Sequence, residues 1–138
     1  MRPLLAKLTP LAVALAAGLS ACGTTSSSAG FSGEKHAVAQ TIVNLQSDAT
    51  SGEQKKICAN DLAAAVIASL GGQSGCEKAI KEQLTQISNL ETTVESVQIG
   101  AAGKTATAQV KSIHEGKSRV TPVTLVREGG SWKVSALQ

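Results

Sequence analysis

The first part of the chain beyond residue 33 has the hydrophobic pattern of helices. Apolar residues recur there every three or four positions, which places them on one face of a helix. The first such series is Val38, Ile42, Leu45 and Ala49, and most of the nearby charged residues fall off that face. This pattern predicts an amphipathic helix at the start of the domain.

Local capping signals predict two further helices after the first. The sequence Ser51-Gly-Glu-Gln54 has the pattern of a capping box and is expected to open a helix that runs through Cys58. Asn60 or Asp61 is expected to cap a third helical stretch, Leu62 to Leu70, which two glycines follow and end.

A second capping box predicts the fourth helix. Ser74-Gly-Cys-Glu77 has the required spacing, and Ile80, Leu84 and Ile87 then share one face. Cys76 is therefore expected near the start of this helix, whereas Cys58 lies at the end of the second helix or at a kink in it.

The hydrophobic pattern changes to alternation from Thr93 onward, which is typical of β-strands. Four alternating segments are separated by turns rich in glycine: 94–99, 105–110, 119–127 and 132–136. Pro122 has no backbone N–H, so its strand is expected to be an edge, or to be bulged, at that position. Helices followed by a meander of strands predict an α+β fold, with the helices packed on one face of a curved antiparallel sheet.

The N-terminus has the pattern of a secretory signal. Arg2 and Lys7 precede an apolar run over residues 11–19, which is too short for a stable membrane span. The sequence Leu19-Ser-Ala-Cys22 that follows resembles the lipobox of bacterial lipoproteins. The resemblance implies that residues 1–21 are removed and that Cys22 becomes an acylated N-terminus. The alternative is an ordinary secretion signal with a chance cysteine.

Residues 22–33 are rich in glycine, serine and threonine, and they are expected to form a flexible tether. Phe31 is the one large apolar residue in this segment, and it is expected to contact either the domain or lipid head groups. The remaining residues, 34–138, are expected to form a single domain. The predicted location is the extracytoplasmic face of the cell membrane, held there by the N-terminal lipid.

Composition narrows the range of functions. The chain has 138 residues, 42% of them hydrophobic, which is enough for one core and too much for a disordered chain. Its formal charge is +3, and removal of Arg2 and Lys7 would leave it almost neutral. Phe31 and Trp132 are the only aromatic residues. A nearly neutral chain with so few aromatic residues is not expected to bind nucleic acid.

Two cysteines remain if Cys22 is acylated, and they are expected to form a structural disulfide. In an oxidising compartment Cys58 and Cys76 allow one intramolecular pairing. A metal pair or a redox thiol is the alternative. However, His36 and His114 lack ligand-like spacing, and a CxxC motif is absent. No metal and no cofactor are therefore expected.

The predicted domain, roughly residues 34–138, resembles a known superfamily in its order of helices followed by four strands and in two short motifs. The turn leading into Lys104-Thr-Ala-Thr-Ala-Gln-Val110 and the ending Glu128-Gly-Gly-Ser-Trp-Lys-Val134 are similar to those of small envelope lipoproteins with a nuclear transport factor two-like, or cystatin-like, domain. The resemblance implies a cone-shaped sheet with a cavity, and a cysteine staple similar to that of actinobacterial members. The strand residues that would line such a cavity are all apolar: Val97, Ile99, Ala106, Ala108, Val110, Val123, Leu125 and Val134.

Two functions follow as hypotheses. The first is a membrane-anchored, non-enzymatic envelope module that binds a small apolar ligand or an envelope protein. The alternative is an isomerase- or dehydratase-like enzyme, because enzymes of this superfamily use Asp, His or Tyr side chains in the cavity. The chain has no tyrosine, and its candidates are Asp48, Asp61 and His114. Both aspartates are expected at exposed or capping positions, so no catalytic residue is assigned.

Overall fold

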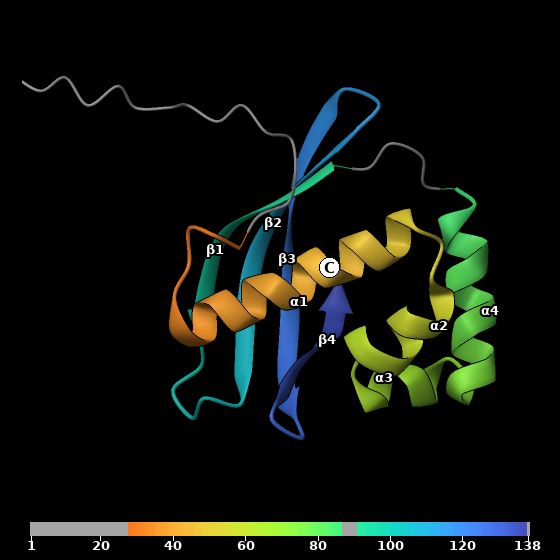
Figure 1. Cartoon of the computed structure of the whole chain (residues 1–138), viewed down its shortest axis with the longest axis horizontal. Coiled ribbons are helices and arrows are strands. Elements are labelled where there is room, and N and C mark those ends of the chain that lie inside the picture. Colours follow the sequence, from red (N-terminus) through yellow and green to blue (C-terminus); the bar gives the residue numbers. More distant parts are fainter. Residues whose placement is uncertain (1–27, 87–90, 138) are drawn as a thin grey trace, which may run out of the picture.

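The computed structural model describes residues 28–86 and 91–137, and it has the predicted α+β class. The predicted signal, Cys22 and Ile87 lie outside the described residues. The helical elements are α1 (Gly33–Thr50), α2 (Gln54–Lys56), a π-helical turn η1 (Ile57–Asp61), α3 (Ala64–Ser69) and α4 (Gly72–Leu84) (Figure 1). The strands are β1 (Glu91–Ile99), β2 (Thr105–His114), β3 (Lys117–Glu128) and β4 (Ser131–Leu137).

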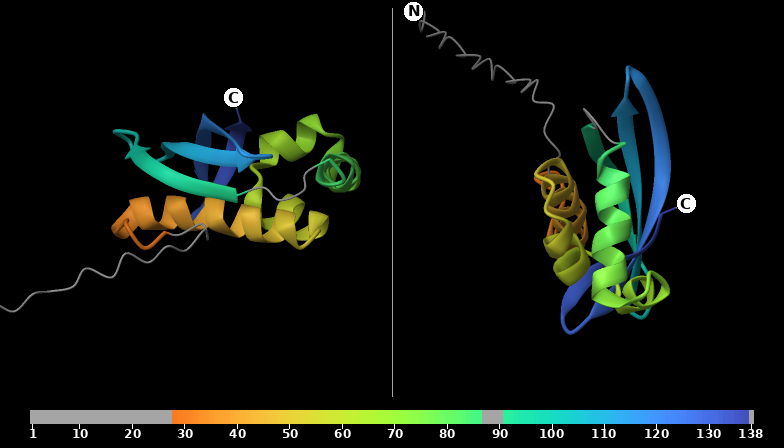
Figure 2. Two further views of the ribbon diagram at one scale, coloured as in Figure 1. Left: turned by 90° about the horizontal axis from the view of Figure 1, so that it is seen from above. Right: turned by 90° about the vertical axis from the view of Figure 1, so that its right-hand side faces the viewer.

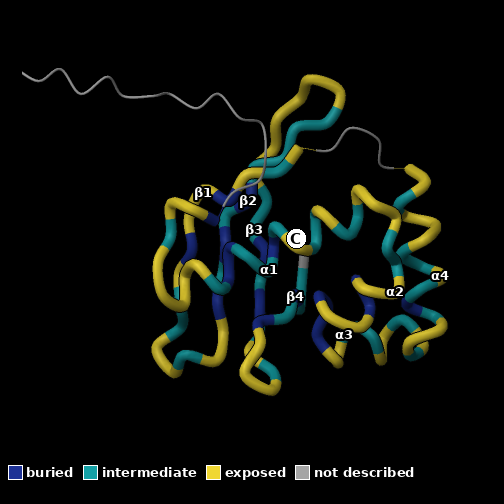
Figure 3. Tube along the Cα trace, viewed as in Figure 1, coloured by how far each residue is buried: buried dark blue, intermediate teal, exposed yellow. Residues whose placement is uncertain are grey.

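The four strands form one antiparallel sheet in the order β1-β2-β3-β4. The sheet is curled, and α1 lies across its inner face (Figure 2). Figure 3 shows that buried positions gather along the strands where they lie behind α1. The alternating apolar residues of the strands point to this face, which explains why alternation in the sequence identified them.

Pro122 lies within β3, just before the described pairing of β3 with β4 begins. β3 is an inner strand, paired with β2 along its length, and Pro122 lies opposite Gln109 of β2. On its other side the described pairing with β4 begins at Val123. The missing N–H of Pro122 therefore interrupts none of the described pairs between β3 and β4.

The first predicted capping box does not form. Ser51 ends α1 instead, and its N–H donates to the carbonyl of Ser47 at 3.0 Å. The next helix starts at Gln54, after Glu53, without a side-chain cap. Because α1 extends to Thr50, Ser51 is already engaged as a helix C-cap and cannot open the next helix.

Asn60 and Asp61 do not cap α3, contrary to expectation. They complete the η1 turn, and the chain then becomes extended, so that the N–H of Ala63 donates to the carbonyl of Val134 at 2.8 Å. The carboxylate of Glu128 supplies the acceptor for the N–H of Ala64, at 3.1 and 3.2 Å. A side chain from the end of β3 thus caps a helix 64 residues earlier in the chain, which local sequence cannot reveal.

The prediction of the second capping box is also wrong, because α4 starts before Ser74. Gly71 adopts a positive φ of 92° and precedes the first residue of α4, Gly72. Ser74 therefore lies inside the first turn. Gly75 lies close to the end of α3, where a Cβ atom would come within 2.0 Å of the carbonyl oxygen of Leu70. This close approach requires glycine and joins α3 tightly to α4.

The folded domain begins earlier than the predicted boundary. Ser28 is buried, its hydroxyl donates to Oε1 of Gln40 at 2.7 Å, and its carbonyl lies 3.0 Å from Nδ1 of His36. Phe31 packs against the hydrophobic core. Of the two contacts expected for this side chain, it therefore makes the one with the domain. Residues 28–33, expected to be part of the tether, thus belong to the domain.

Candidate functional site

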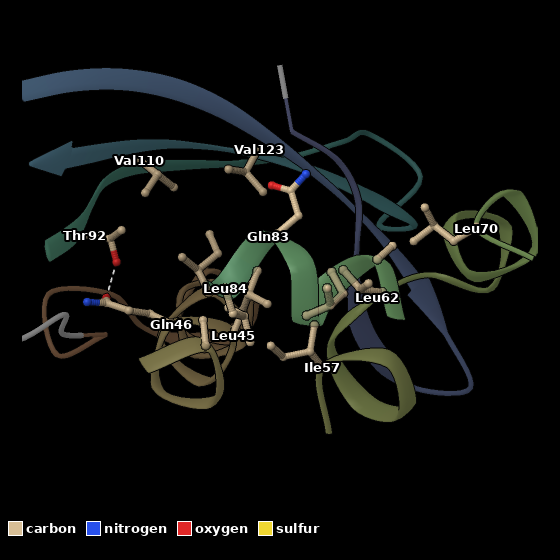
Figure 4. A pocket seen from close by; sticks show the side chains of 14 residues that line it. Leu45, Gln46, Ile57, Leu62, Leu70, Gln83, Leu84, Thr92, Val110 and Val123 are labelled. Atoms are coloured by element: carbon tan, nitrogen blue, oxygen red, sulfur yellow. Dashed lines mark hydrogen bonds between the residues drawn. The ribbon is translucent and has the colours of Figure 1, made fainter. Parts of the chain in front are cut away.

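The candidate site is an apolar pocket of about 420 Å³ between α1, α4 and the inner face of the sheet (Figure 4). Eleven of its fourteen lining side chains are aliphatic: Ile42, Leu45, Ala49, Ile57, Leu62, Leu70, Ala79, Ile80, Leu84, Val110 and Val123. Clefts that hold small molecules have volumes of roughly 300–1,000 Å³ and mostly apolar walls. The pocket therefore has the size and the surface of a ligand site.

The polar groups in the wall carry no charge. They are Gln46 of α1, Gln83 of α4 and Thr92 of β1. The hydroxyl of Thr92 donates a hydrogen bond to Oε1 of Gln46, which links α1 to β1 at one end of the pocket (Figure 4). The lining includes no charged side chain, and its mostly aliphatic surface is suited to hold an apolar molecule.

The pocket exists because α4 packs against the other helical elements rather than flat on the sheet. The Cys58–Cys76 disulfide, predicted from the sequence, joins η1 to the first half of α4, with the Cα atoms 6.0 Å apart. Both cysteines are fully buried. The disulfide holds the N-terminal part of α4, while Ile80 and Leu84 further along the helix face the open space.

The helices supply most of the pocket wall, whereas the sequence placed the cavity lining on the strands. Of the eight strand residues proposed, Val110 and Val123 line the pocket. The other six belong to the hydrophobic core instead. Ile99 packs against this core, and the remaining five are buried in it: Val97, Ala106, Ala108, Leu125 and Val134. The helical wall could have been anticipated from the apolar stripes of the first and fourth predicted helices.

A second, polar cavity of about 480 Å³ lies against a different face of α1. It is lined by that helix, by η1 and by the start of β4 with the preceding turn: His36, Ala37, Gln40, Thr41, Asn44, Asn60, Asp61, Gly130, Ser131, Trp132 and Lys133. Several of these side chains already form hydrogen bonds with one another or with the backbone. The amide of Gln40 donates to Asn44 at 2.9 Å, and the ammonium of Lys133 donates to the carbonyl of Asn60.

Asp61 is the exceptional residue of this polar cavity, because its side chain is only 4% exposed. The prediction that it would be exposed or capping was wrong. Within the described part of the chain, its Oδ2 has no hydrogen-bond partner. Burial raises the pKa of Asp61 to about 7, the neighbouring Asp48 carboxylate adds to this rise, and Lys133 opposes it. Asp61 is therefore largely protonated below neutral pH.

The three acid–base candidates do not meet in the apolar pocket. Asp48 is half-buried on α1 and lies close enough to Asp61 to affect its pKa. His114 lies at the end of β2, next to the turn that leads into β3. None of the three lines the apolar pocket.

Among residues 28–86 and 91–137, no group of three or more His, Cys, Asp or Glu side chains is arranged to hold a metal ion. No helix within these ranges is long and apolar enough to cross a membrane. Comparison of the chain with known protein families, with characterised proteins and with solved structures found no match.

Proposed function

We propose that the protein is a cell-envelope lipoprotein, anchored through Cys22, whose domain binds a small apolar molecule in the pocket between α1, α4 and the sheet. The observation that carries this proposal is the mostly aliphatic wall of the pocket, with eleven aliphatic and three uncharged polar side chains. Exposed cavities of this kind are costly to keep hydrated, because apolar surface gains free energy when it leaves water.

The proposed anchor rests on the N-terminal sequence. A positive start, an apolar run and the sequence Leu19-Ser-Ala-Cys22 occur in the order that lipoprotein processing requires. Two acyl chains on Cys22 would hold the protein stably on a bilayer, since each buried methylene contributes about 0.8 kcal/mol. The resemblance to envelope lipoproteins with a nuclear transport factor two-like domain supports the same assignment.

The direct test is intact mass spectrometry of the protein extracted from its own membrane, under native and then denaturing conditions. The proposal predicts a chain that starts at Cys22 and carries acyl groups, together with a noncovalent ligand that is lost on denaturation. An unmodified chain cut elsewhere would overturn the anchor. A ligand-free pocket that also fails to bind apolar reporters would overturn the binding function.

Asp61 supports a second candidate, an enzyme of the isomerase or dehydratase type. A buried carboxyl group with a pKa near neutrality is suited to general acid–base catalysis. However, it lines the polar cavity rather than the apolar pocket, so an enzymatic substrate would bind between α1, η1 and β4 and would have to be polar. Loss of a measured activity in Asp61→Asn, with the fold retained, would favour this candidate.

A further inference from the structure

We infer that the pocket ligand is an amphiphile with an aliphatic tail and an uncharged polar end, and that the polar end lies beside Gln46 and Thr92. This inference rests on the proposed function of the pocket as a ligand site. It narrows the ligand from any apolar molecule to one chemical class, exemplified by a long-chain alcohol, ester or amide.

The wall favours an aliphatic tail over an aromatic ring system. All the apolar lining residues are Ala, Val, Leu or Ile, and the two aromatic side chains of the chain, Phe31 and Trp132, lie elsewhere. Aromatic ligands gain specific stacking energy from aromatic walls, which this pocket does not offer. Aliphatic chains gain their affinity from contacts with surfaces of this type and from leaving water.

Polar side chains are distributed unevenly along the pocket, and this determines the orientation in which an amphiphilic ligand would bind. Figure 4 shows Gln46 and Thr92 at one end, with Leu62 and Leu70 at the other. At the apolar end Ile57 and Leu62 are buried, and Leu70 is half-buried. Gln46 and Thr92 are also half-buried. A tail would therefore lie along the aliphatic wall toward Leu62, and the polar end of the ligand would lie beside Gln46 and Thr92.

The absence of charged side chains from the pocket wall disfavours a carboxylate as the polar end. A buried charge is costly without a partner of opposite charge, and no lining residue supplies one. A hydroxyl or amide group can instead join the hydrogen bond between Thr92 and Gln46, because both side chains can donate and accept.

The test is a displacement assay with the oxidised protein and the apolar fluorescent reporter N-phenyl-1-naphthylamine. Dodecanol, dodecanoate and 2-naphthol compete for the reporter, so that tail and polar end are varied separately. We expect dodecanol to displace the reporter at a concentration at least about tenfold lower than dodecanoate or naphthol does. The double variant Gln46→Leu/Thr92→Val is expected to bind the reporter but to lose this discrimination.

Matched controls separate the polar end from general effects on the fold. Thr93→Val and Gln98→Leu alter exposed side chains of β1 and should leave the preference unchanged. If dodecanoate or naphthol displaces the reporter as well as dodecanol does, the inference about the ligand class is overturned while the binding function stands. If the reporter does not bind the oxidised protein and a direct calorimetric titration with dodecanol also shows no binding, the proposed function itself fails.

Discussion

Replacement of Asp61 by asparagine should change how the stability of the protein depends on pH. The carboxyl group is 4% exposed, and its pKa is raised from 3.8 to about 7. Between these two values the folded protein keeps a proton that the unfolded chain releases. Stability from this group is thus complete below about pH 4 and is lost as the pH rises toward about pH 7. Asparagine is close to aspartate in size and stays neutral at every pH, so its contribution to stability is not lost as the pH rises.

The magnitude follows from the size of the shift. One pKa unit corresponds to about 1.4 kcal/mol, so the full shift corresponds to about 4 kcal/mol. About 3 kcal/mol of this falls between about pH 5 and about pH 8.5, where the domain can be measured conveniently. The free energy of unfolding of Asp61→Asn, minus that of the native chain, should rise by this amount across the interval.

Urea denaturation followed by the fluorescence of Trp132, the single tryptophan, is a suitable assay. Titrating groups that do not interact with Asp61 are present in both proteins and cancel in the difference, whereas Asp48 and Lys133 interact with it and are tested separately. Asp48→Asn should reduce the pH dependence without abolishing it, because burial is the larger cause of the shift. Lys133→Met should move the loss of stability to higher pH, since Lys133 lowers the pKa. A difference between Asp61→Asn and the native chain that stays constant with pH would refute this reasoning.

Three further changes test how the elements around the pocket are held. Replacing Cys58 and Cys76 by alanine should lower the free energy of unfolding by about 3 kcal/mol in urea denaturation, because the bond closes a loop with a sequence separation of 18. Gly75→Ala should cost about 1–3 kcal/mol in the same assay, since its Cβ would lie 2.0 Å from a backbone oxygen at the end of α3. Glu34→Ala should cost about 1 kcal/mol and shift the fluorescence of Trp132, whose indole N–H donates to that carboxylate at 2.8 Å.

Each of these three predictions has a result that would contradict it. An unchanged urea midpoint after loss of the disulfide would show that α4 is held by packing alone. Gly30→Ala is the control for Gly75→Ala, because its Cβ meets open space, and it should change stability by less than about 0.5 kcal/mol. Equal changes in the free energy of unfolding for Gly30→Ala and Gly75→Ala would refute the steric argument. Glu95→Ala, at the β1 bulge, is the control for Glu34→Ala and should leave the Trp132 spectrum unchanged. An equally unchanged spectrum in Glu34→Ala would contradict the predicted effect of the hydrogen bond from Trp132 to Glu34.

The features that could be predicted from the sequence are those set by short-range patterns. Alternation identified all four strands, because one face of the sheet packs against α1 while the other is open. The glycine-rich turns at 100–104 and 128–130 also follow from local composition. The pairing of Cys58 with Cys76 follows instead from the expected acylation of Cys22, which leaves two cysteines and one possible pairing. The apolar stripe of the first helix was correct, and Ile42 and Leu45 both line the pocket.

The features that could not be predicted depend on residues far apart in the chain. Glu128 caps α3 from the end of β3, so the nearby Asn60 and Asp61 are not needed as caps. Asp61 is buried because η1 and the extended segment after it pack beside α1 and β4, which no local pattern encodes. The apolar faces of the helices that line the pocket can be read from the sequence, but the open space between them depends on the gap that α4 leaves above the sheet. That gap results from tertiary packing rather than from the sequence of any one element.

The central claim is that an apolar molecule occupies the pocket, and filling the pocket tests it most directly. Ala79→Phe places a ring among the lining residues, whereas Ala68→Phe places the same ring on an exposed position of α3. Binding of N-phenyl-1-naphthylamine would be titrated in both variants and in the native protein, with urea denaturation as the check on folding. The account predicts that Ala79→Phe folds normally and loses reporter binding, while Ala68→Phe binds like the native protein. Undiminished binding in a folded Ala79→Phe variant would contradict it.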